Sequence, residues 1–497
     1  MTATMHDSER ASGQVVTRGL RWLTLGRLAE MGLSFLATAV LARLLAPEDF
    51  GLMAAAAVVT SLASAVFEGS FGMSVVQKRE VGPDYLATSF WLAIGAAIVL
   101  LALIAATAPL VERFFGFAGV SVVLVAMSLT ILLKAISSVP RALLQRQLRF
   151  RQLAVISLSS YLAGSGLLTL VLGVYGYAVW SLVAGAVLSA AIEALAMFLL
   201  SGLGWRLRPR IALIGDILRP GSSFTVAQLF NWAANTGPNS VVGHWLGAHM
   251  LGLYSRGWKL LDVAVSAVAA PMSRVMLPVF SRTQHDLARC RADFFRTLSI
   301  AVPCFGAISL MMVLHADLAV LIALGHRWAD TTPVVQLLFA ALLPRCAFKI
   351  AESLIVGLGQ PAIVARLQAF YGALMVAGAW VGSHYGLHGV ALATSLSITV
   401  VYVGYLACAC RLVGGSFAEL LRLHARCAVL LSPTALVHLA LPRDSGSWPV
   451  PIGSVLLDAM ILFAAFCLAP SHWLGSDLCA LRHHLFNRRT QGVADND

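Results

Sequence analysis

The feature that most constrains this chain is a series of apolar blocks of about 20 residues, separated by short polar segments. Coiled into an α-helix, such a block spans the ~30 Å hydrocarbon core of a bilayer. The blocks are rich in Ala, Leu and Gly and lack alternation between polar and apolar residues, which argues against membrane-spanning strands. Only 12% of the residues are charged, against about 25% in a typical soluble domain. The sequence therefore predicts an all-α polytopic membrane protein.

We expect about fourteen transmembrane helices in two related six-helix lobes, followed by two further C-terminal helices. The expected spans begin near Leu20, Gly51, Leu86, Phe117, Gln152, Gly176, Gly221, Leu251, Phe294, Pro333, Ile363, Leu387, Ala425 and Ile452. The corresponding segments are a tail at 1–19, a first lobe at 20–201, a linker at 202–220, a second lobe at 221–412, the extra helices at 413–470 and a tail at 471–497. The first apolar helix is expected to direct insertion, because the polar start of the chain has no removable signal peptide.

Basic residues are distributed unevenly over the expected loops, and this predicts the orientation of the chain. Of the 35 Lys and Arg residues, 25 fall at one set of alternate span ends, whereas six fall at the other: Arg43, Arg113, Arg256, Lys259, Arg327 and Arg443. The richer side of a membrane protein is the cytoplasmic one. Both termini are therefore expected in the cytoplasm of a bacterial cell, and the net charge of +12 reflects membrane topology rather than nucleic-acid binding.

Two short segments resemble each other at an offset of about 200 residues. Leu45-Ala-Pro-Glu-Asp-Phe-Gly-Leu52 aligns with Leu246-Gly-Ala-His-Met-Leu-Gly-Leu253, each after the first span of its half. Tyr175-Gly176 and Tyr385-Gly386 match in the same way before spans six and twelve. Weak self-similarity between two halves is typical of transporters and places the substrate path between them. Chance similarity of Gly/Leu-rich loops is the alternative.

Several basic residues lie at bilayer depth, where charge is costly and usually functional. Arg345 and Lys349 of span ten lie on one helix face with Glu352, and Arg345 falls near the midplane. A guanidinium can bind a phosphate through two hydrogen bonds, and a lysine adds a point charge. We therefore expect Arg345 and Lys349, together with Arg27 and Lys134, to bind a pyrophosphate. A self-neutralising triad through Glu352, and a Lys134 that extends to the membrane surface, are the alternatives.

Span seven carries a continuous polar stripe, composed of Gln228, Asn231, Asn235 and Asn239. Neutral hydrogen-bond donors and acceptors on the wall of a hydrated cavity can bind sugar hydroxyls. We therefore expect this stripe to line a substrate cavity. An interhelical polar seam is the alternative.

The remaining polar positions are interpreted as ion pairs, gates or packing contacts. Glu30 and Glu68 lie at depths where each could pair with Arg27, and such a pair could equally hold two helices together. Arg256 and Asp262, near the outer end of span eight, are expected to form an ion pair or to act as gating residues in release. Glu193 and Asp458 stand isolated, so a hydrogen bond within the bundle is favoured over binding of a coupling ion.

Enzymatic motifs and metal-ligand spacings do not stand out. The sequence contains no HExxH, Walker A or GxSxG pattern and no CxxC pair. We predict no enzymatic activity, no cofactor and no metal, and interpret the eight cysteines as small apolar packing residues.

Four stretches together resemble a known family: Leu41-Ala-Arg-Leu-Leu-Ala-Pro-Glu-Asp-Phe-Gly51, Ser138-Val-Pro-Arg-Ala-Leu-Leu-Gln-Arg-Gln-Leu-Arg-Phe150, Leu246-Gly-Ala-His-Met-Leu-Gly-Leu-Tyr-Ser-Arg256 and Leu358-Gly-Gln-Pro361. They resemble the Wzx-type polysaccharide transporters of the multidrug/oligosaccharidyl-lipid/polysaccharide exporter superfamily. The resemblance spans residues 18 to 412. It implies two six-helix lobes, two extra helices, a cationic central cavity and alternating access. Many relatives have an acidic residue in span seven, where this chain has Asn235-Thr-Gly-Pro-Asn239.

The resemblance implies outward transport of polyprenyl-pyrophosphate-linked oligosaccharide repeat units before polymerisation. The expected partners are this lipid-linked substrate, membrane lipids, and a polysaccharide polymerase with its chain-length regulator. Nucleic acid is not expected, and the chain is expected to act as a monomer. A cation-coupled drug antiporter of the same superfamily and a membrane polymerase or ligase are the competing functions. An antiporter would favour acidic cavity residues, and an enzyme would need a large outer loop.

Overall fold

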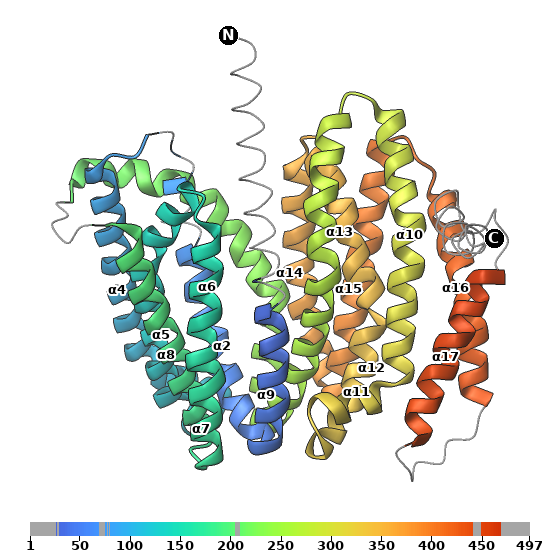
Figure 1. Cartoon of the computed structure of the whole chain (residues 1–497), viewed down its shortest axis with the longest axis horizontal. Coiled ribbons are helices and arrows are strands. Elements are labelled where there is room, and N and C mark those ends of the chain that lie inside the picture. Colours follow the sequence, from blue (N-terminus) through green and yellow to red (C-terminus); the bar gives the residue numbers. More distant parts are fainter. Residues whose placement is uncertain are drawn as a thin grey trace, which may run out of the picture. The chain divides into compact units, whose positions relative to one another are not determined.

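The computed structural model describes residue 26 and residues 29–68, 75–76, 78, 80–203, 209–440 and 449–468. Within these ranges the chain is helical and contains no strand (Figure 1). A helix at 29–44 precedes the labelled elements. These are α2 (Pro47–Glu68), α4 (Pro83–Phe115), α5 (Val120–Arg146), α6 (Phe150–Tyr161), η1 (Leu162–Leu168), α7 (Thr169–Val174), α8 (Val179–Ser201), η2 (Ile211–Leu213), α9 (Ile214–Thr283), α10 (Leu287–Leu314), α11 (Ala316–Ala323), η3 (His326–Thr331), α12 (Thr332–Ala340), α13 (Leu342–Gly357), α14 (Pro361–Ser383), α15 (Gly386–Leu412), α16 (Phe417–Ala440) and α17 (Pro449–Leu468).

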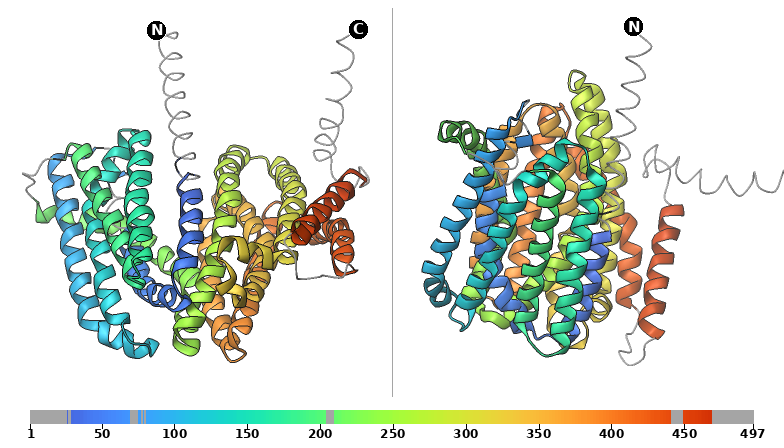
Figure 2. Two further views of the ribbon diagram at one scale, coloured as in Figure 1. Left: turned by 60° about the horizontal axis from the view of Figure 1, so that its bottom comes forward. Right: turned by 60° about the vertical axis from the view of Figure 1, so that its left-hand side comes forward.

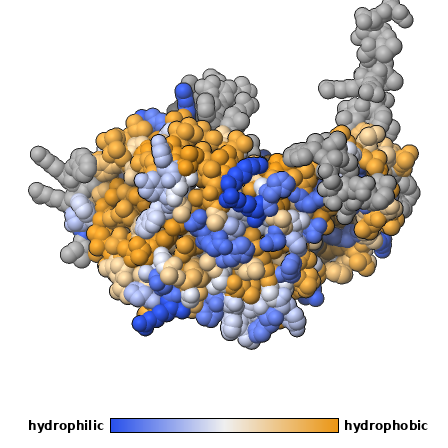
Figure 3. All heavy atoms as spheres, turned by 90° about the horizontal axis from the view of Figure 1, so that it is seen from below, coloured by the Kyte–Doolittle hydropathy of each residue, from blue (hydrophilic) through white to orange (hydrophobic). Residues whose placement is uncertain are grey.

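The lengths of these helices confirm the expected class of polytopic membrane protein. Nine helices in the described ranges are long and apolar enough to cross a bilayer, and the bent pair Gln228–Ala269 and Pro271–Thr283 qualifies together. Each expected span coincides with helix wherever the structure describes it, the first from residue 29 onward. Large apolar side chains remain exposed on α4 at Ile98, Leu103 and Leu110. Such a surface suits lipid contact, and the broad apolar areas in Figure 3 are consistent with it.

Two compact units divide the described chain, and each is considered by itself. Unit 1 comprises residues 1–256, 322–328 and 375–387, and unit 2 comprises 257–321, 329–374 and 388–497. The long helix α9 contributes to both units, and its backbone breaks at Gly247, with φ 86° and ψ 178°. This break separates the two spans that the sequence predicts near Gly221 and Leu251.

Helix α5 is the central helix of unit 1. It packs against α2, α4 and α8, which run alongside it in Figures 1 and 2. Its buried residues include Val123, Leu124, Ile131 and Ala135, which are at most 2% exposed. Because these apolar residues hold one face of α5 against its neighbours, the remaining face can carry polar groups such as Lys134.

The two segments that the sequence aligns as a repeat lie against each other in unit 1. A Cβ on Gly51 would lie 2.0 Å from the Ala248 carbonyl oxygen, and a Cβ on Gly252 would lie 1.9 Å from the Pro47 carbonyl oxygen. In the repeat alignment, whose offset is 201 residues, Gly51 corresponds to Gly252 and Pro47 corresponds to Ala248. Each glycine therefore contacts the residue that lies four positions before the other glycine. The contact is therefore reciprocal, as a pseudo-two-fold axis requires.

Further contacts involve residues at equivalent repeat positions. His249 Nδ1 lies 2.6 Å from Glu48 Oε1, so two residues at equivalent repeat positions form an ion pair when the imidazole is protonated. Arg43 donates a hydrogen bond to the Ile322 carbonyl (3.0 Å), and His244, which is 201 residues later, contacts the Phe114 carbonyl. The predicted repeat is thus present in the tertiary contacts as well as in the sequence.

Candidate functional site

A cavity of about 520 Å³ opens inside unit 1. Its wall is formed by helices that are widely separated in sequence, namely α2, α5, η1, α8 and α9. The lining residues are Ala57, Thr60, Ser61, Ser64, Met127, Thr130, Lys134, Ser165, Ala186, Ser189, Ala190, Glu193, Gln228, Asn231, Trp232, Asn235 and Thr236. Most of them carry neutral hydroxyl or amide groups, which is an unusual lining inside a membrane bundle.

Helix α9 provides the amide side of the cavity. Gln228, Asn231 and Asn235 recur at i, i+3 and i+7, so they share one face, and all three line the cavity. Asn239, the fourth residue of the predicted stripe, is half-buried and lies outside the lining. The Asn235 amide donates hydrogen bonds to the Asn231 backbone carbonyl (2.8 Å) and side-chain oxygen (2.9 Å). This arrangement fixes the orientation of two neighbouring amides on the wall.

Trp232 adds an aromatic ring to the same wall. Its indole N–H is shared between the Val58 carbonyl (3.2 Å) and the Ser61 hydroxyl (3.1 Å), both on α2. These hydrogen bonds hold the indole against α2 and leave part of it in the cavity lining. A fixed aromatic face is a suitable stacking surface for a ligand.

A stretch of π-helix shapes the opposite wall. η1 interrupts the helix between α6 and α7, and Ser165 within it lines the cavity. A Cβ on Gly164 would lie 2.4 Å from the Ser189 backbone nitrogen, so glycine is required for this close approach to α8. The Ser189 hydroxyl in turn donates to the Ser160 carbonyl (2.9 Å). π-Bulges often occur at functional sites, because the widened turn redirects side chains.

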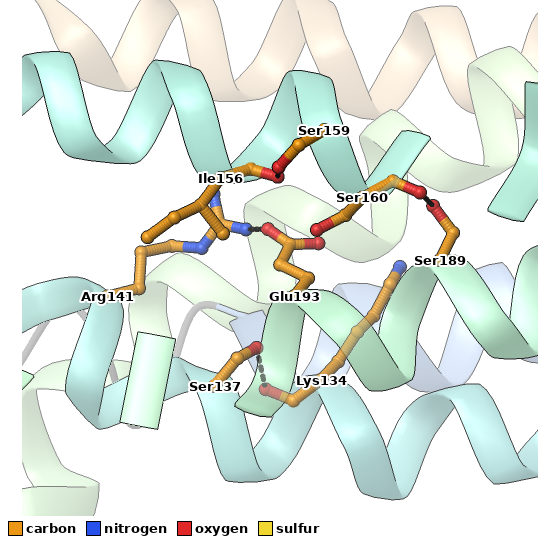
Figure 4. Close-up of polar contacts among 8 residues, drawn as sticks. All are labelled: Lys134, Ser137, Arg141, Ile156, Ser159, Ser160, Ser189 and Glu193. Atoms are coloured by element: carbon orange, nitrogen blue, oxygen red, sulfur yellow. Dashed lines mark hydrogen bonds and ion pairs between the residues drawn. The ribbon is translucent and has the colours of Figure 1, made fainter. Parts of the chain in front are cut away.

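The charged residues of the cavity are Lys134 on α5 and Glu193 on α8. The Glu193 carboxylate forms an ion pair with Arg141, which lies two turns after Lys134 on the same face of α5 (Figure 4). In that view Lys134 extends beside Glu193 toward Ser189 of α8. The predicted isolation of Glu193 is therefore wrong, because Arg141 lies within helix α5 rather than in a loop. Its predicted hydrogen-bonded role within the bundle is confirmed.

The predicted cluster of span ten lies in unit 2, and none of its residues lines the cavity of unit 1. Arg345 is 6% exposed, donates to the Tyr371 hydroxyl (2.6 Å) and lies over the Trp258 ring at 4.7 Å. Lys349 pairs with Glu352 at 2.7 Å, as the self-neutralising alternative describes. The structure therefore gives each of these basic groups protein partners within its own unit.

Other predicted residues fall in different surroundings. Arg256 lies over the Phe50 ring at 4.6 Å, and Asp262 is half-buried. Glu30 is close enough to Tyr161 for an electrostatic interaction, and the Tyr161 hydroxyl also bonds to Ser34. The side chains of Arg27 and Glu68 lie outside the described residues.

Several cavity residues were not predicted from the sequence. Trp232, the hydroxyl residues of α2 and the Arg141–Glu193 pair became apparent only from the structure. One sequence signal was available, since Thr60, Ser61 and Ser64 cluster on one side of α2, within a mostly apolar stretch. Gly164 and Gly166 in an apolar span were a second signal, because paired glycines mark close helix contacts.

Two curated proteins that are similar to this chain are named for lipopolysaccharide and succinoglycan biosynthesis. The lipopolysaccharide biosynthesis protein WzxC of Escherichia coli K12 is 25% identical over 382 residues, which cover 75% of this chain and 76% of that protein. The succinoglycan biosynthesis transport protein ExoT of Rhizobium meliloti is 25% identical over 375 residues, covering 75% and 74%.

Solved structures of two transporter types share the fold. A lipid II flippase MurJ in an inward closed conformation has a TM-score of 0.72 at 12% identity, over 89% of this chain and 98% of that one. An inward-facing multidrug resistance MATE family transporter of the MOP superfamily has a TM-score of 0.63 at 17% identity, over 77% and 94%. The family profile described as polysaccharide biosynthesis protein matches residues 40–333. Because this match covers more than half of the sequence, the chain belongs to the polysaccharide biosynthesis protein family.

Proposed function

We propose that this protein is a flippase that moves polyprenyl-pyrophosphate-linked oligosaccharide repeat units from the cytoplasmic to the outer leaflet by alternating access. The observation that carries the proposal is the cavity of unit 1, where neutral hydroxyls and amides surround a tryptophan inside a membrane bundle. Sugars need many neutral hydrogen-bond partners, and a membrane protein provides these at such density only at considerable cost.

The sugar and the pyrophosphate of the proposed ligand each have matching groups on the cavity wall. Hydroxyls of the sugar would exchange hydrogen bonds with Asn231, Asn235 and Ser189, and a sugar face would stack on Trp232. The ammonium group of Lys134 provides positive charge for the pyrophosphate. Arg345 and Lys349 remain proposed pyrophosphate residues at a second position, where they would have to exchange Tyr371 and Glu352 for the substrate.

The membrane and the partners follow from the same proposal. The excess of basic residues on one set of loops supports an inner-membrane protein with both termini in the cytoplasm. The product would appear in the outer leaflet, where a polymerase and a chain-length regulator would use it. The curated relatives named for lipopolysaccharide and succinoglycan synthesis support this place in the sequence of reactions.

The decisive experiment measures transport in proteoliposomes that contain purified full-length protein and a fluorescent polyprenyl-pyrophosphate oligosaccharide. A membrane-impermeant lectin or hydrolase reports how much substrate reaches the outer leaflet. Lys134→Gln should lower the rate at least tenfold, whereas Arg289→Gln, an exposed residue outside the cavity, should leave it unchanged. Equal rates for empty and protein-containing liposomes would refute the flippase proposal.

A drug antiporter is the second candidate, because Glu193 places one carboxylate in the cavity wall. Such a carboxylate could bind an organic cation only after it leaves Arg141. Tight binding of an organic cation that Glu193→Gln abolishes, without binding of a pyrophosphate lipid, would favour the antiporter.

A further inference from the structure

Three buried side chains of ligand type meet in unit 2, and none of them lines the cavity of unit 1. His315 follows the end of α10, His438 lies in the last turn of α16, and Asp458 lies within α17. The Asp458 Oδ2 atom lies 2.9 Å from His315 Nε2 and 2.6 Å from His438 Nδ1. The three residues are 8%, 5% and 1% exposed, in the same order. The sequence predicted a hydrogen bond for Asp458, which is confirmed, but it gave no indication of a second or third ligand.

The charge of Asp458 has to be balanced at this position. α17 is otherwise apolar, and an ionised carboxylate at bilayer depth is costly without an opposite charge. Among the described residues, the ion-pair partners of Asp458 are the two imidazoles, which are neutral unless they bind a proton. A cation bound between the three side chains would balance an ionised carboxylate at this position.

His438 has one ring nitrogen without a partner. Its Nε2 atom is buried and has no hydrogen-bond partner among the described residues. A buried polar atom without a partner is uncommon in folded proteins. The Thr434 hydroxyl, one turn before His438, is likewise fully buried without a partner in the described chain.

The three ligand atoms are close enough to share one ion. All of them lie within 4.8 Å of one another, and the imidazole rings meet edge to face at 86° with centroids 5.0 Å apart. Zinc binds nitrogen and carboxylate oxygen at about 2.0–2.2 Å, which separates tetrahedral ligand atoms by about 3.3 Å. The contacts of 2.9 and 2.6 Å would have to lengthen by about 0.4 and 0.7 Å, within reach of side-chain rotation.

We propose that His315, His438 and Asp458 form a binding site for one divalent transition-metal ion of the zinc type. Two imidazoles and one carboxylate are ligands that zinc and its neighbours prefer, whereas magnesium and calcium prefer oxygen alone. The ion would join α10, α16 and α17, which pack together in unit 2 (Figure 2). It would thereby fix the C-terminal helix pair on the rest of that unit.

Metal content of the purified full-length protein tests the site. The protein carries an affinity tag without histidine, is stripped with EDTA, loaded with Zn²⁺, desalted and analysed by mass spectrometry of the elements. Wild type and His285→Gln, an exposed histidine of the same unit, should each retain about one zinc per chain. His315→Gln, His438→Gln and Asp458→Asn should each retain at least tenfold less.

Two further readouts keep the test decisive if a variant is unstable. Co²⁺ in place of zinc should give the visible absorption bands of a four-coordinate site in the wild-type protein, which needs no substitution. Zinc should also raise the melting temperature of wild type and His285→Gln but not that of Asp458→Asn, each compared with its own stripped form. The proposal would be overturned if wild type retained no more zinc than Asp458→Asn, or if all three variants retained as much zinc as wild type. The three side chains would then form a hydrogen-bonded contact without a metal.

Discussion

At the scale of single residues, the structure separates polar groups that line a cavity from those that do not. Asn231, Asn235 and Trp232 line the cavity of unit 1, whereas Arg345 and Lys349 contact Tyr371 and Glu352 in unit 2. The difference is not visible in the sequence, where all five are polar or aromatic residues on amphipathic faces. The packing of the helices decides it, because it determines which polar faces enclose the cavity.

Trp232 provides the sharpest test of the cavity at this scale. Trp232→Ala removes the ring, and the loss of about 1.4 kcal/mol of aromatic contact corresponds to about tenfold weaker ligand binding. Trp232→Phe keeps an aromatic face while it loses the hydrogen bonds to Val58 and Ser61. We expect the alanine variant to transport at about one tenth of the wild-type rate and the phenylalanine variant to stay within threefold. Equal losses in both variants would show that the hydrogen bonds, and not the ring, are what matters.

Arg345 provides a test that separates binding of pyrophosphate from a structural contact. Tyr371→Phe removes the hydroxyl that accepts from Arg345, and the net loss of stability should be about 1 kcal/mol. If Arg345 binds substrate, Tyr371→Phe should transport normally and Arg345→Lys should transport at least tenfold more slowly. Thermal melting of both variants checks the structural part. Parallel losses of stability and transport in the two variants would assign Arg345 to structure alone.

At the scale of elements, two glycines allow the repeated segments to approach each other. Gly51 and Gly252 place their Cα atoms against the carbonyls of Ala248 and Pro47, where a methyl group has no space. Gly51→Ala and Gly252→Ala should therefore each destabilise the protein by about 1–3 kcal/mol. Gly95→Ala, at a helical position with open space around it, is the matched control and should be neutral or stabilising. Thermal melting in detergent measures all three, and unchanged stability of both contact variants would contradict the reciprocal contact.

The same contact gives a test of conformational change. Alternating access would require the Glu48–His249 pair to separate in one state, because it joins the start of α2 to the part of α9 that follows Gly247. A disulfide between Glu48→Cys and His249→Cys should abolish transport, and a reductant should restore it. The single cysteine variants, which retain the native cysteines, serve as controls. Full transport by the oxidised double variant would mean that this contact stays closed throughout the cycle.

At the scale of the whole molecule, charge asymmetry predicts the orientation in the membrane. With 25 basic residues at one set of span ends and six at the other, the two termini should face the same compartment as the richer set. Reporter fusions at both ends, one active only inside the cell and one only outside, check this expectation. Opposite reporter results at the two ends would require an odd number of spans.

The sequence by itself determined the class of the protein, the positions of its spans and the internal repeat. These properties depend on local composition, since any segment of about 20 apolar residues must become helical to satisfy its backbone in lipid. The polar stripe of α9 could be predicted for the same reason, because it needs only the 3.6-residue period. Tertiary structure decided which polar groups meet: Arg141 with Glu193, Glu48 with His249, and His315 with His438 and Asp458. These partners lie between 20 and 201 residues apart, so only the packing of the helices, which no local pattern encodes, brings them together.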